Sequence, residues 1–409
     1  MEFFVIKYAK YLGFIFVGYC FWYIGHNSYL YHCNATDPVI SIEGVVDGAY
    51  FAGTLQGKIS GTHPYKILNY SILIDDKAVK TDCSVSRSVF ENKISIPVDA
   101  MDNGKHTIKF IVVSGAKKHN VVEIEKVFYV DNADLQAGFV KPNSENKVLQ
   151  GRCLHLQFQV NKPIKKAIVT ALSHEYYAYP ESNGSLLYET FIPVECEQHP
   201  SEYSFSVQIK DYIDTSFDLH GTFQVTPFQF KKKILNVPSG ALDREREFTD
   251  LTEKDFESKM EELSKASISQ KLWQGVFEVP LAMTSITTEF GIQRIAQERG
   301  SYIHKALDMV ASAPRSVVWA SQSGVVVLKD RYAHSGNTIV IDHGWGILSM
   351  YFHLETYANI EVGQKIRKGN PIGTMGKTGY ANGYHLHWEI RVGDIAIDPM
   401  QWTKRDFIS

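Results

Sequence analysis

Three short motifs in the last third of the chain contain the residue types that bind a divalent metal and move protons. In chain order they contribute His304 and Asp308, then His353, then His385 and His387. A zinc ion takes a small set of imidazole and carboxylate ligands, and a catalytic zinc keeps one position open for water. His304, Asp308 and His387 could supply that set. The motifs therefore predict a metal site suited to chemistry on water.

The spacing inside these motifs indicates how the chain must run to bring them together. Alternate side chains of a strand share one face, so His385 and His387 are expected to point into one site. Residues four apart, such as His304 and Asp308, do so as well, although this spacing also fits a helix. A glycine and a proline bracket the segment and a strand-rich pattern follows it, which favours strand or loop.

Further motifs flank the histidines in a fixed order. They are E-F-G-I-Q-R at Glu289–Arg294, V-I-D-H-G-W-G at Val340–Gly346, and the glycine-rich Val362–Gly379. With the H-x-x-x-D, aromatic-x-H-L and H-L-H motifs, this order resembles the lysostaphin/LytM-type zinc metallopeptidases, which cut peptide bonds in the cross-links and stems of bacterial peptidoglycan. The resemblance covers roughly the last third of the chain.

The resemblance implies a role for each histidine motif. His304, Asp308 and His387 fall on the family's ligands for one zinc ion, and His353 and His385 fall on its two catalytic histidines that do not bind the metal. One of these two would take a proton from the zinc-bound water, and the other would stabilise the oxyanion or protonate the leaving amine. The sequence leaves open which histidine does which.

The resemblance also implies a substrate, with alternatives. We expect a zinc metalloendopeptidase that acts on peptidoglycan, most simply between D-alanine and meso-diaminopimelate, or on glycine bridges in a thick-walled host. A second hypothesis is a catalytically silent scaffold that binds cell wall and activates other hydrolases, and a third is a peptidase with a protein substrate. Silent members usually lack a metal ligand, whereas all three positions are filled here. The residues after His304, Lys305-Ala-Leu, depart from the family pattern and put the side-chain preference in doubt.

The first residues suggest export. Lys7 and Lys10 precede an uncharged apolar run at Tyr11–Ile24, as the positive-inside rule expects. The run is shorter than the about 20 residues that span a bilayer, so residues 1–36 are either a signal anchor or a signal peptide. Without an A-x-A site or a lipobox, an anchor in the cytoplasmic membrane is favoured. The enzyme would then lie in the periplasm or cell envelope.

Composition bounds the remaining possibilities. A chain of 409 residues is long enough for two to four domains, and 44% hydrophobic residues suffice for their cores. A formal net charge of -3 argues against nucleic acid as a partner. Five cysteines are too few and too scattered for a disulfide scaffold. Cys153 and Cys196 would form either one disulfide or two buried thiols.

The fold class predicted is mainly β, with two β-sandwich modules before an antiparallel C-terminal domain of the duplicated hybrid motif type. Residues 37–132 resemble an immunoglobulin-like module, with strands at Tyr70–Asp75, Thr107–Val113 and Val121–Val130. A second module at 133–230 has alternating runs at Leu154–Val160 and Tyr203–Ile209. The modules would serve as a spacer, a cover for the active site or a platform for a protein partner.

The charged segment 231–271 is predicted to be a helical linker, and 272–409 the metallopeptidase domain. Phe256, Met260 and Leu263 fall on one helical face and are expected to pack against a neighbouring domain. Within the last domain, His343 is expected to make a structural hydrogen bond and Arg294 an ion pair that stabilises the fold.

Overall fold

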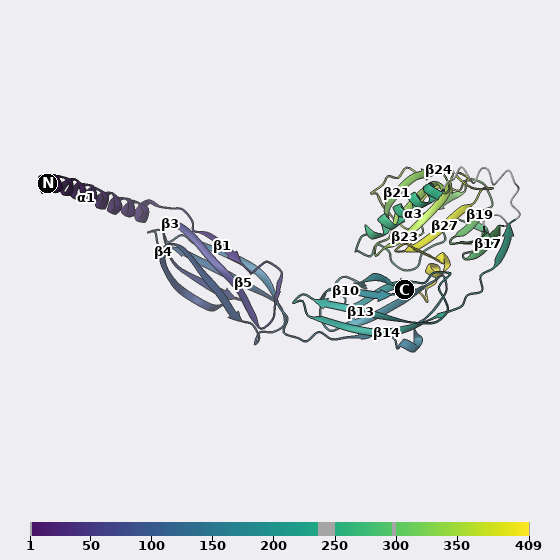
Figure 1. The fold of residues 1–409 in the computed structure, drawn as a ribbon, viewed down its shortest axis with the longest axis horizontal. Helices are drawn as coiled ribbons and strands as arrows, with labels where there is room; N and C mark the ends of the chain where they lie inside the picture. The colour runs from purple at the N-terminus through teal and green to yellow at the C-terminus, as the bar shows by residue number, and fades with distance from the viewer. Residues whose placement is uncertain (1, 236–249, 297–299, 409) are drawn as a thin grey trace. The chain divides into compact units, whose positions relative to one another are not determined.

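The computed structural model describes residues 2–235, 250–296 and 300–408, and most of its elements are strands. The chain divides into two compact units, Met1–Asp134 with Tyr212–Asp214, and Leu135–Asp211 with Thr215–Ser409 (Figure 1). The prediction of a mainly β protein is confirmed.

Helix α1 spans Glu2–Cys33 and begins the first unit. Its described apolar side chains, such as Phe14 and Trp22, are exposed. Among the described residues, no helix is long and apolar enough to cross a membrane. The anchor or signal peptide expected at residues 1–36 stays a prediction.

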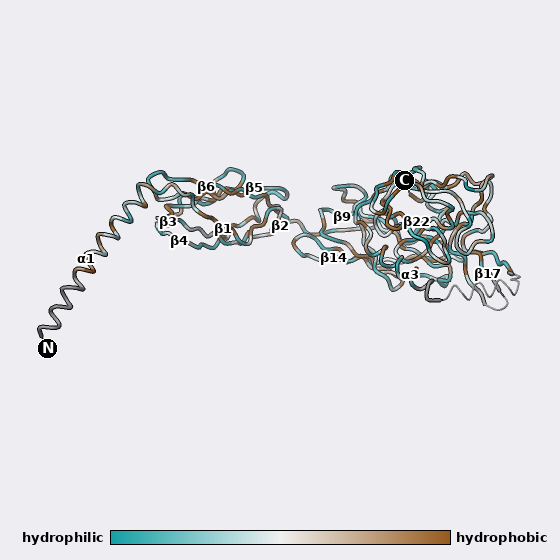
Figure 2. The backbone as a smooth tube through the Cα atoms, turned by 90° about the horizontal axis from the view of Figure 1, so that it is seen from above, coloured by the Kyte–Doolittle hydropathy of each residue, from teal (hydrophilic) through white to brown (hydrophobic). Residues whose placement is uncertain are grey.

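The rest of the first unit is one connected sheet around its own core. Its strands are β1 (Val39–Glu43), β2 (Ala49–Phe51), β3 (Thr54–Ile74), β4 (Lys77–Pro97), β5 (Gly104–Ser114) and β6 (Val121–Val130). Their order is β1-β3-β5-β6-β2, with β4 paired to β3. Hydrophobic and hydrophilic residues are mixed along the strands of this unit (Figure 2), and buried residues alternate with partly exposed ones in the second half of β5.

All three strands predicted in the first module are present. The strand that contains Tyr70–Asp75 is far longer than predicted, because β3 and β4 form one hairpin of two 21-residue strands. Asp75 and Asp76 join them with φ of 48° and 61°. Two consecutive residues in this left-handed region are typical of the tight turn whose twist matches a long hairpin.

The second unit begins with a sheet in the order β7-β9-β12-β11-β10-β13-β14-β8. Its strands are β7 (Ala137–Phe139), β8 (Lys147–Leu149), β9 (Cys153–Val160), β10 (Ile164–Ala171), β11 (His174–Pro180), β12 (Leu187–Pro193), β13 (Glu202–Asp211) and β14 (Ser216–Thr226). The predicted strands at Leu154–Val160 and Tyr203–Ile209 lie inside β9 and β13. Asn183 and Gly184 lie in the connection between β11 and β12.

This sheet shares a core with the C-terminal part of the same unit. Cys153, Phe191 and Cys196 belong to the hydrophobic cluster that contains Trp402. The side chain of Gln401 donates to the backbone carbonyl of Cys153 at 2.9 Å and accepts from its backbone N–H at 2.8 Å. Both cysteines are buried free thiols, which decides between the two alternatives for this pair.

The C-terminal part contains an antiparallel sheet in the order β16-β19-β27-β23-β22-β21-β25, with β28 paired to β27. These strands are β16 (Met283–Thr288), β19 (Leu307–Ala311), β21 (Gly324–Tyr332), β22 (Gly336–Asp342), β23 (Ile347–Leu354), β25 (Lys365–Ile366), β27 (Leu386–Val392) and β28 (Ile395–Ile397). A smaller sheet has the order β20-β26-β24, formed by Val317–Trp319, Pro371–Thr374 and Thr356–Tyr357.

The described residues of the segment expected to be a linker, 231–235 and 250–271, pack against this domain. Strand β15 (Lys232–Leu235) pairs with β17 (Ile292–Ala296), which pairs with β18 (Gly300–His304). Helix α3 (Asp250–Lys265) packs Phe256 and Met260 into a buried cluster with Leu348, Met350 and Phe352, and Leu263 joins it. The predicted apolar helix face is confirmed. Because α3 covers one face of β23, every residue of that strand is buried.

Candidate metal centre

The three predicted metal ligands lie on neighbouring strands. His304 is the last residue of β18, Asp308 lies on β19, and His387 lies on β27 directly opposite Asp308. Lys305 and Ala306 lie between β18 and β19. His304 and Asp308 therefore belong to two successive strands, neither to a helix nor to a single strand with a shared face.

The ligand atoms converge on one carboxylate oxygen. Oδ1 of Asp308 lies 3.0 Å from Nε2 of His304 and 2.9 Å from Nδ1 of His387. His304 and Asp308 are buried, and His387 is partly buried. Within residues 2–235, 250–296 and 300–408, this is the one group of three His, Cys, Asp or Glu side chains whose ligand atoms all lie within 4.8 Å of one another.

Electrostatics favour a charged carboxylate here. Burial raises the pKa of Asp308, but its hydrogen bonds with His304 and His387 outweigh burial and hold that pKa well below its ordinary value. Burial lowers the pKa of His304. Burial acts in the same direction on His387, but hydrogen bonds with Asp308 and Glu389 raise the pKa of His387 to about 9. The carboxylate of Asp308 is thus a buried anion, and it is suited to bind a cation.

Groups behind the ligands orient them. Nδ1 of His304 faces the carbonyl oxygen of Glu289 at 3.5 Å, and Nε2 of His387 faces Oε2 of Glu389 at 3.6 Å. Ligating histidines commonly donate their second N–H to a carbonyl or carboxylate in this way. Nε2 of His304 and Nδ1 of His387 then remain free for a cation. Two imidazole nitrogens and one carboxylate fit a zinc site that keeps a position open for water.

The predicted ion pair of Arg294 is confirmed, and its partner is Asp308 itself. Nη2 of Arg294 lies 3.1 Å from Oδ2 of Asp308 and donates to Oγ1 of Thr288 at 3.1 Å. The two oxygens of Asp308 therefore divide their contacts, one toward the histidines and the other toward the guanidinium.

His353 and His385 lie beside the ligands, with ring centroids 4.7 Å apart. Nδ1 of His353 donates to the carbonyl oxygen of Thr378, and Nδ1 of His385 donates to that of Gly383, each at 2.9 Å. Burial, together with His387 and His385, holds the pKa of His353 well below its ordinary value. In the neutral rings these bonds leave Nε2 as the acceptor, and Nε2 of His385 lies 3.9 Å from Oδ1 of Asp308.

Gly376 brings these two histidines together. Its carbonyl oxygen accepts the backbone N–H of His385 at 3.0 Å. A Cβ at this position would lie 2.5 Å from the carbonyl oxygen of His353 and 2.2 Å from the backbone nitrogen of Glu355. Gly376 and Gly373 of the Val362–Gly379 motif are both required by close approach of two backbones rather than by a turn.

Sequence reasoning missed Glu389 as a partner of His387. The sequence contains a signal for this contact, because Glu389 follows His387 by two positions and residues two apart on a strand share a face. His343, by contrast, is as predicted. Its Nδ1 donates to the carbonyl oxygen of Ser323 and its Nε2 pairs with Oγ of Ser349, both at 2.7 Å. Burial lowers the pKa of His343 to about 4.

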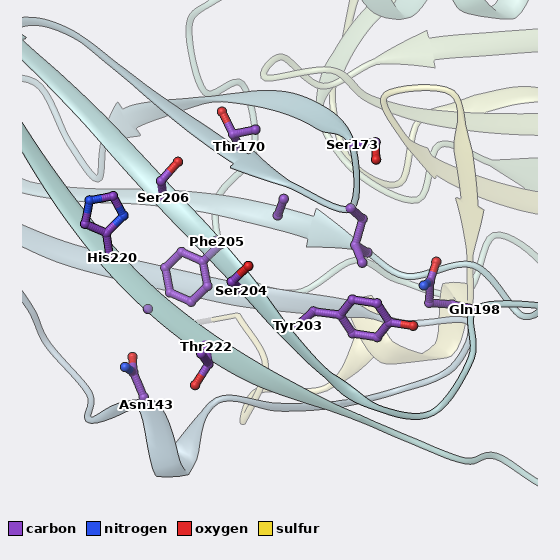
Figure 3. Close-up of a pocket in the computed structure, with 13 residues that line it drawn as sticks. Asn143, Thr170, Ser173, Gln198, Tyr203, Ser204, Phe205, Ser206, His220 and Thr222 are labelled. Carbon is purple, nitrogen blue, oxygen red and sulfur yellow. The ribbon is translucent and has the colours of Figure 1, made fainter.

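Two hollows lie away from the ligands. A groove of about 880 Å³ runs over β10, β13 and β14 of the second unit, where Thr170, Ser206 and His220 are cross-strand neighbours (Figure 3). A smaller one of about 320 Å³ is lined by Arg331, Tyr332, Ala333 and Gly379. The smaller hollow contains none of the five predicted site residues, although its Gly379 directly follows Thr378, whose carbonyl oxygen accepts from His353.

Comparison with known proteins identifies the segment that carries the centre. Residues 302–399, which include all five predicted site residues, match the sequence model of Peptidase family M23. DD-carboxypeptidase/endopeptidase Mpg of Neisseria meningitidis serogroup B is 33% identical over 129 residues, 31% of this chain and 29% of that protein. Peptidoglycan DD-endopeptidase ShyC of Vibrio cholerae is 31% identical over 121 residues, 29% of this chain and 28% of that protein.

A third relative is named as an activator of hydrolases rather than as a peptidase. Murein hydrolase activator EnvC of Escherichia coli is 31% identical over 97 residues, 24% of this chain and 23% of that protein. The chain therefore spans less than a third of the length of each of these relatives.

Proposed function

We propose that this chain, whose C-terminal domain belongs to Peptidase family M23, is a zinc-dependent endopeptidase that hydrolyses peptide bonds in peptidoglycan. The observation that carries the proposal is the convergence of His304 and His387 on one oxygen of Asp308, with two further histidines beside them. The names of two relatives, both of which specify DD-endopeptidase activity, support the same reaction class.

His304, Asp308 and His387 would hold the zinc ion. Bound there, zinc would lower the pKa of a water molecule and polarise the carbonyl of the scissile bond. Arg294 keeps the carboxylate of Asp308 charged and oriented, since it pairs with the oxygen that the histidines do not face. Glu289 and Glu389 fix the two imidazole rings so that the correct nitrogen is presented.

His353 and His385 would handle the protons. Each is held by an N–H bond from Nδ1 to a backbone carbonyl, so each presents an unprotonated Nε2 when neutral. One ring takes the proton from the attacking water and then holds it for the leaving amine. The other would stabilise the developing oxyanion only in its protonated form, in which Nε2 carries an N–H donor. The ring centroids of His353 and His385 lie 4.7 Å apart, which supports the proposal that both rings act on the same bound substrate.

The bond we propose is the cross-link between D-alanine and meso-diaminopimelate. A DD-endopeptidase cuts between two centres of D configuration, and this is the activity that the names of Mpg and ShyC state. Such a substrate lies outside the cytoplasmic membrane, so we also propose that the chain is exported to the cell envelope. Fractionation of cells tests this: recovery of the protein in the cytoplasm alone would contradict it.

A second candidate function is activation of other murein hydrolases, which the similarity to EnvC favours. The complete set of ligand and catalytic positions argues for the enzyme. The two candidates predict different behaviour toward an isolated substrate, because an activator needs a partner hydrolase and an endopeptidase does not.

The deciding experiment combines zinc content with digestion of cross-linked muropeptide dimers, with the products identified by mass spectrometry. We expect the purified protein to hold about one zinc per chain and to convert dimers to monomers. The His385→Ala variant should keep zinc and lose turnover, because its side chain is not a ligand. A zinc-loaded protein that cuts no dimer but accelerates a murein hydrolase would establish the activator instead.

A further inference from the structure

We propose that Glu257 of helix α3 is a positioning residue for the metal ligand His387, and that it acts through Arg391 and Glu389. This inference rests on the proposed zinc site. It assigns a role in that site to a segment before the peptidase motifs, more than a hundred residues from the ligand that it positions.

The contacts that link Glu257 to His387 pass through two residues of strand β27, Glu389 and Arg391. Glu389 follows His387 by two positions and so faces the same side, with Oε2 at 3.6 Å from Nε2 of the ring. Its other oxygen, Oε1, accepts from Nε of Arg391. Both side chains are buried, with 5% and 6% of their residue surfaces exposed. A buried carboxylate this close to a metal ligand needs a fixed counter-charge, and Arg391 provides it.

Glu257 of helix α3 is the last residue in this series of contacts. Nη1 and Nη2 of Arg391 donate to the two carboxylate oxygens of Glu257 at 2.5 Å and 2.9 Å. A bidentate pair of this kind fixes the plane of the guanidinium as well as its position. Since the same guanidinium holds Glu389 through Nε, its orientation determines where Oε2 of Glu389 meets His387. Loss of Glu257 would leave Arg391 bound at one edge only.

The neighbouring residue of the helix reaches the same ligand from another side. Phe256 packs edge-on against Phe352, with ring centroids 5.5 Å apart. Phe352 stacks on the imidazole of His387 at 4.8 Å and an interplanar angle of 6°. Helix α3 therefore supports the His387 ring by both an aromatic and an ionic contact, and it packs on β23, the strand paired with β27 (Figure 1).

The test measures the zinc affinity of the full-length protein by competition with a chromogenic chelator, and the thermal midpoint of the zinc-free protein. Glu257→Gln removes the charge at a half-exposed position, and Glu389→Gln removes the carboxylate that faces His387. Glu261→Gln is the matched control. It lies one turn further along α3, where its partner is the exposed Lys265 at 2.5 Å.

We expect Glu389→Gln to weaken zinc binding about 10- to 100-fold, as is usual for residues behind a ligand. Glu257→Gln should weaken it by a smaller factor, and Glu261→Gln should leave it unchanged. Because Glu257 acts through Glu389, the double variant should bind zinc no more weakly than Glu389→Gln alone. The thermal midpoints of the zinc-free Glu257→Gln and Glu261→Gln variants should fall equally little.

Unchanged zinc affinity in Glu257→Gln, or losses that add in the double variant, would overturn the inference. If Glu389→Gln does not fold, the comparison of Glu257→Gln and Glu257→Ala with the control decides alone. The readout is zinc affinity rather than turnover. A protein that binds zinc but cuts no muropeptide would refute the endopeptidase and still permit this test.

Discussion

Oδ2 of Asp308 lies 3.1 Å from Nη2 of Arg294, while Oδ1 of the same carboxylate faces His304 and His387. Through this division the side chain presents a single oxygen to the metal position. The Glu-Phe-Gly-x-x-Arg motif that precedes the first ligand thereby acquires a physical role, because its arginine sets the orientation of the carboxylate.

Replacement of Arg294 by glutamine should weaken zinc binding about 10- to 100-fold, since Asp308 loses the group that orients it. Chelator competition on the purified protein measures this. Arg367→Gln is the control, because Arg367 is exposed and lies outside the centre. If both variants bind zinc with the affinity of the unchanged protein, Arg294 has only a role in folding.

Substitution of a ligand should remove both metal and activity. We expect His304→Ala and His387→Ala to be purified with little zinc and to cut no muropeptide dimer, because two remaining ligands hold zinc poorly. Elemental analysis and the dimer assay check this, with the exposed His199→Ala as a control. Removal of zinc by a chelator should abolish turnover in the unchanged protein, and added zinc should restore it. Activity that survives in the ligand variants would refute the assignment.

Gly376→Ala should be damaging although the change is one methyl group. The new Cβ would lie 2.5 Å from the carbonyl oxygen of His353, a backbone atom that cannot easily move. Overpacking of this kind costs about 1–3 kcal/mol. We expect a lower thermal midpoint and a larger loss of turnover than of zinc content, because His353 and His385 are displaced.

The nearby Gly383→Ala is the matched control for this substitution. A Cβ at Gly383 would have no neighbour within 4 Å, so stability should be unchanged. If the two alanine variants have the same midpoint and the same turnover, the close approach at Gly376 is unimportant.

Stability of the first unit should depend on pH through His106. Burial lowers the pKa of His106, but its hydrogen bonds with Asp75 and with the carbonyl of Asp102 outweigh burial and raise that pKa above its ordinary value of about 6.5. Burial raises the pKa of Asp75, but bonds with His106 and Thr107 leave it lowered.

The signs of these two shifts set the pH window. A raised histidine pKa adds stability that is complete below about pH 6.5 and is lost as the pH rises through the folded-state pKa. The lowered pKa of Asp75 adds stability above about pH 3.9 that is lost at more acidic pH. Calorimetry between about pH 6 and 8.5 should therefore show one transition moving down with pH, and His106→Gln should flatten that dependence. An equal slope in the variant would contradict this origin.

Local pattern was enough for much of the fold. Alternation along Val121–Val130 matches β6 residue for residue, because a strand with one buried face leaves a period of two in the sequence. The pattern at Tyr70–Asp75 predicts only a short strand, whereas the structure has the long hairpin of β3 and β4. Its turn uses two aspartates in the left-handed region, a conformation that glycine and asparagine usually signal.

Segment 231–271, which precedes the peptidase motifs, shows which contacts the sequence pattern does not predict. Its charge predicts a helical linker, and the apolar face of Phe256, Met260 and Leu263 predicts packing against a neighbouring domain, which the structure confirms. The strand that it adds beside β17 and the ion pair that it makes with Arg391 depend on partners distant in the chain. No local pattern encodes such partners.

The sequence by itself determined the chemical types of the centre, since three spaced motifs contain two imidazoles and a carboxylate with two further histidines. Their roles stay predictions until zinc and turnover are measured. Tertiary structure alone decided that His304 and Asp308 come from two successive strands, that Arg294 pairs with Asp308, and that Glu257 of α3 pairs with Arg391. The physical reason is that ligand identity is a property of single residues, whereas orientation is set by neighbours that only antiparallel pairing and buried charge bring into contact.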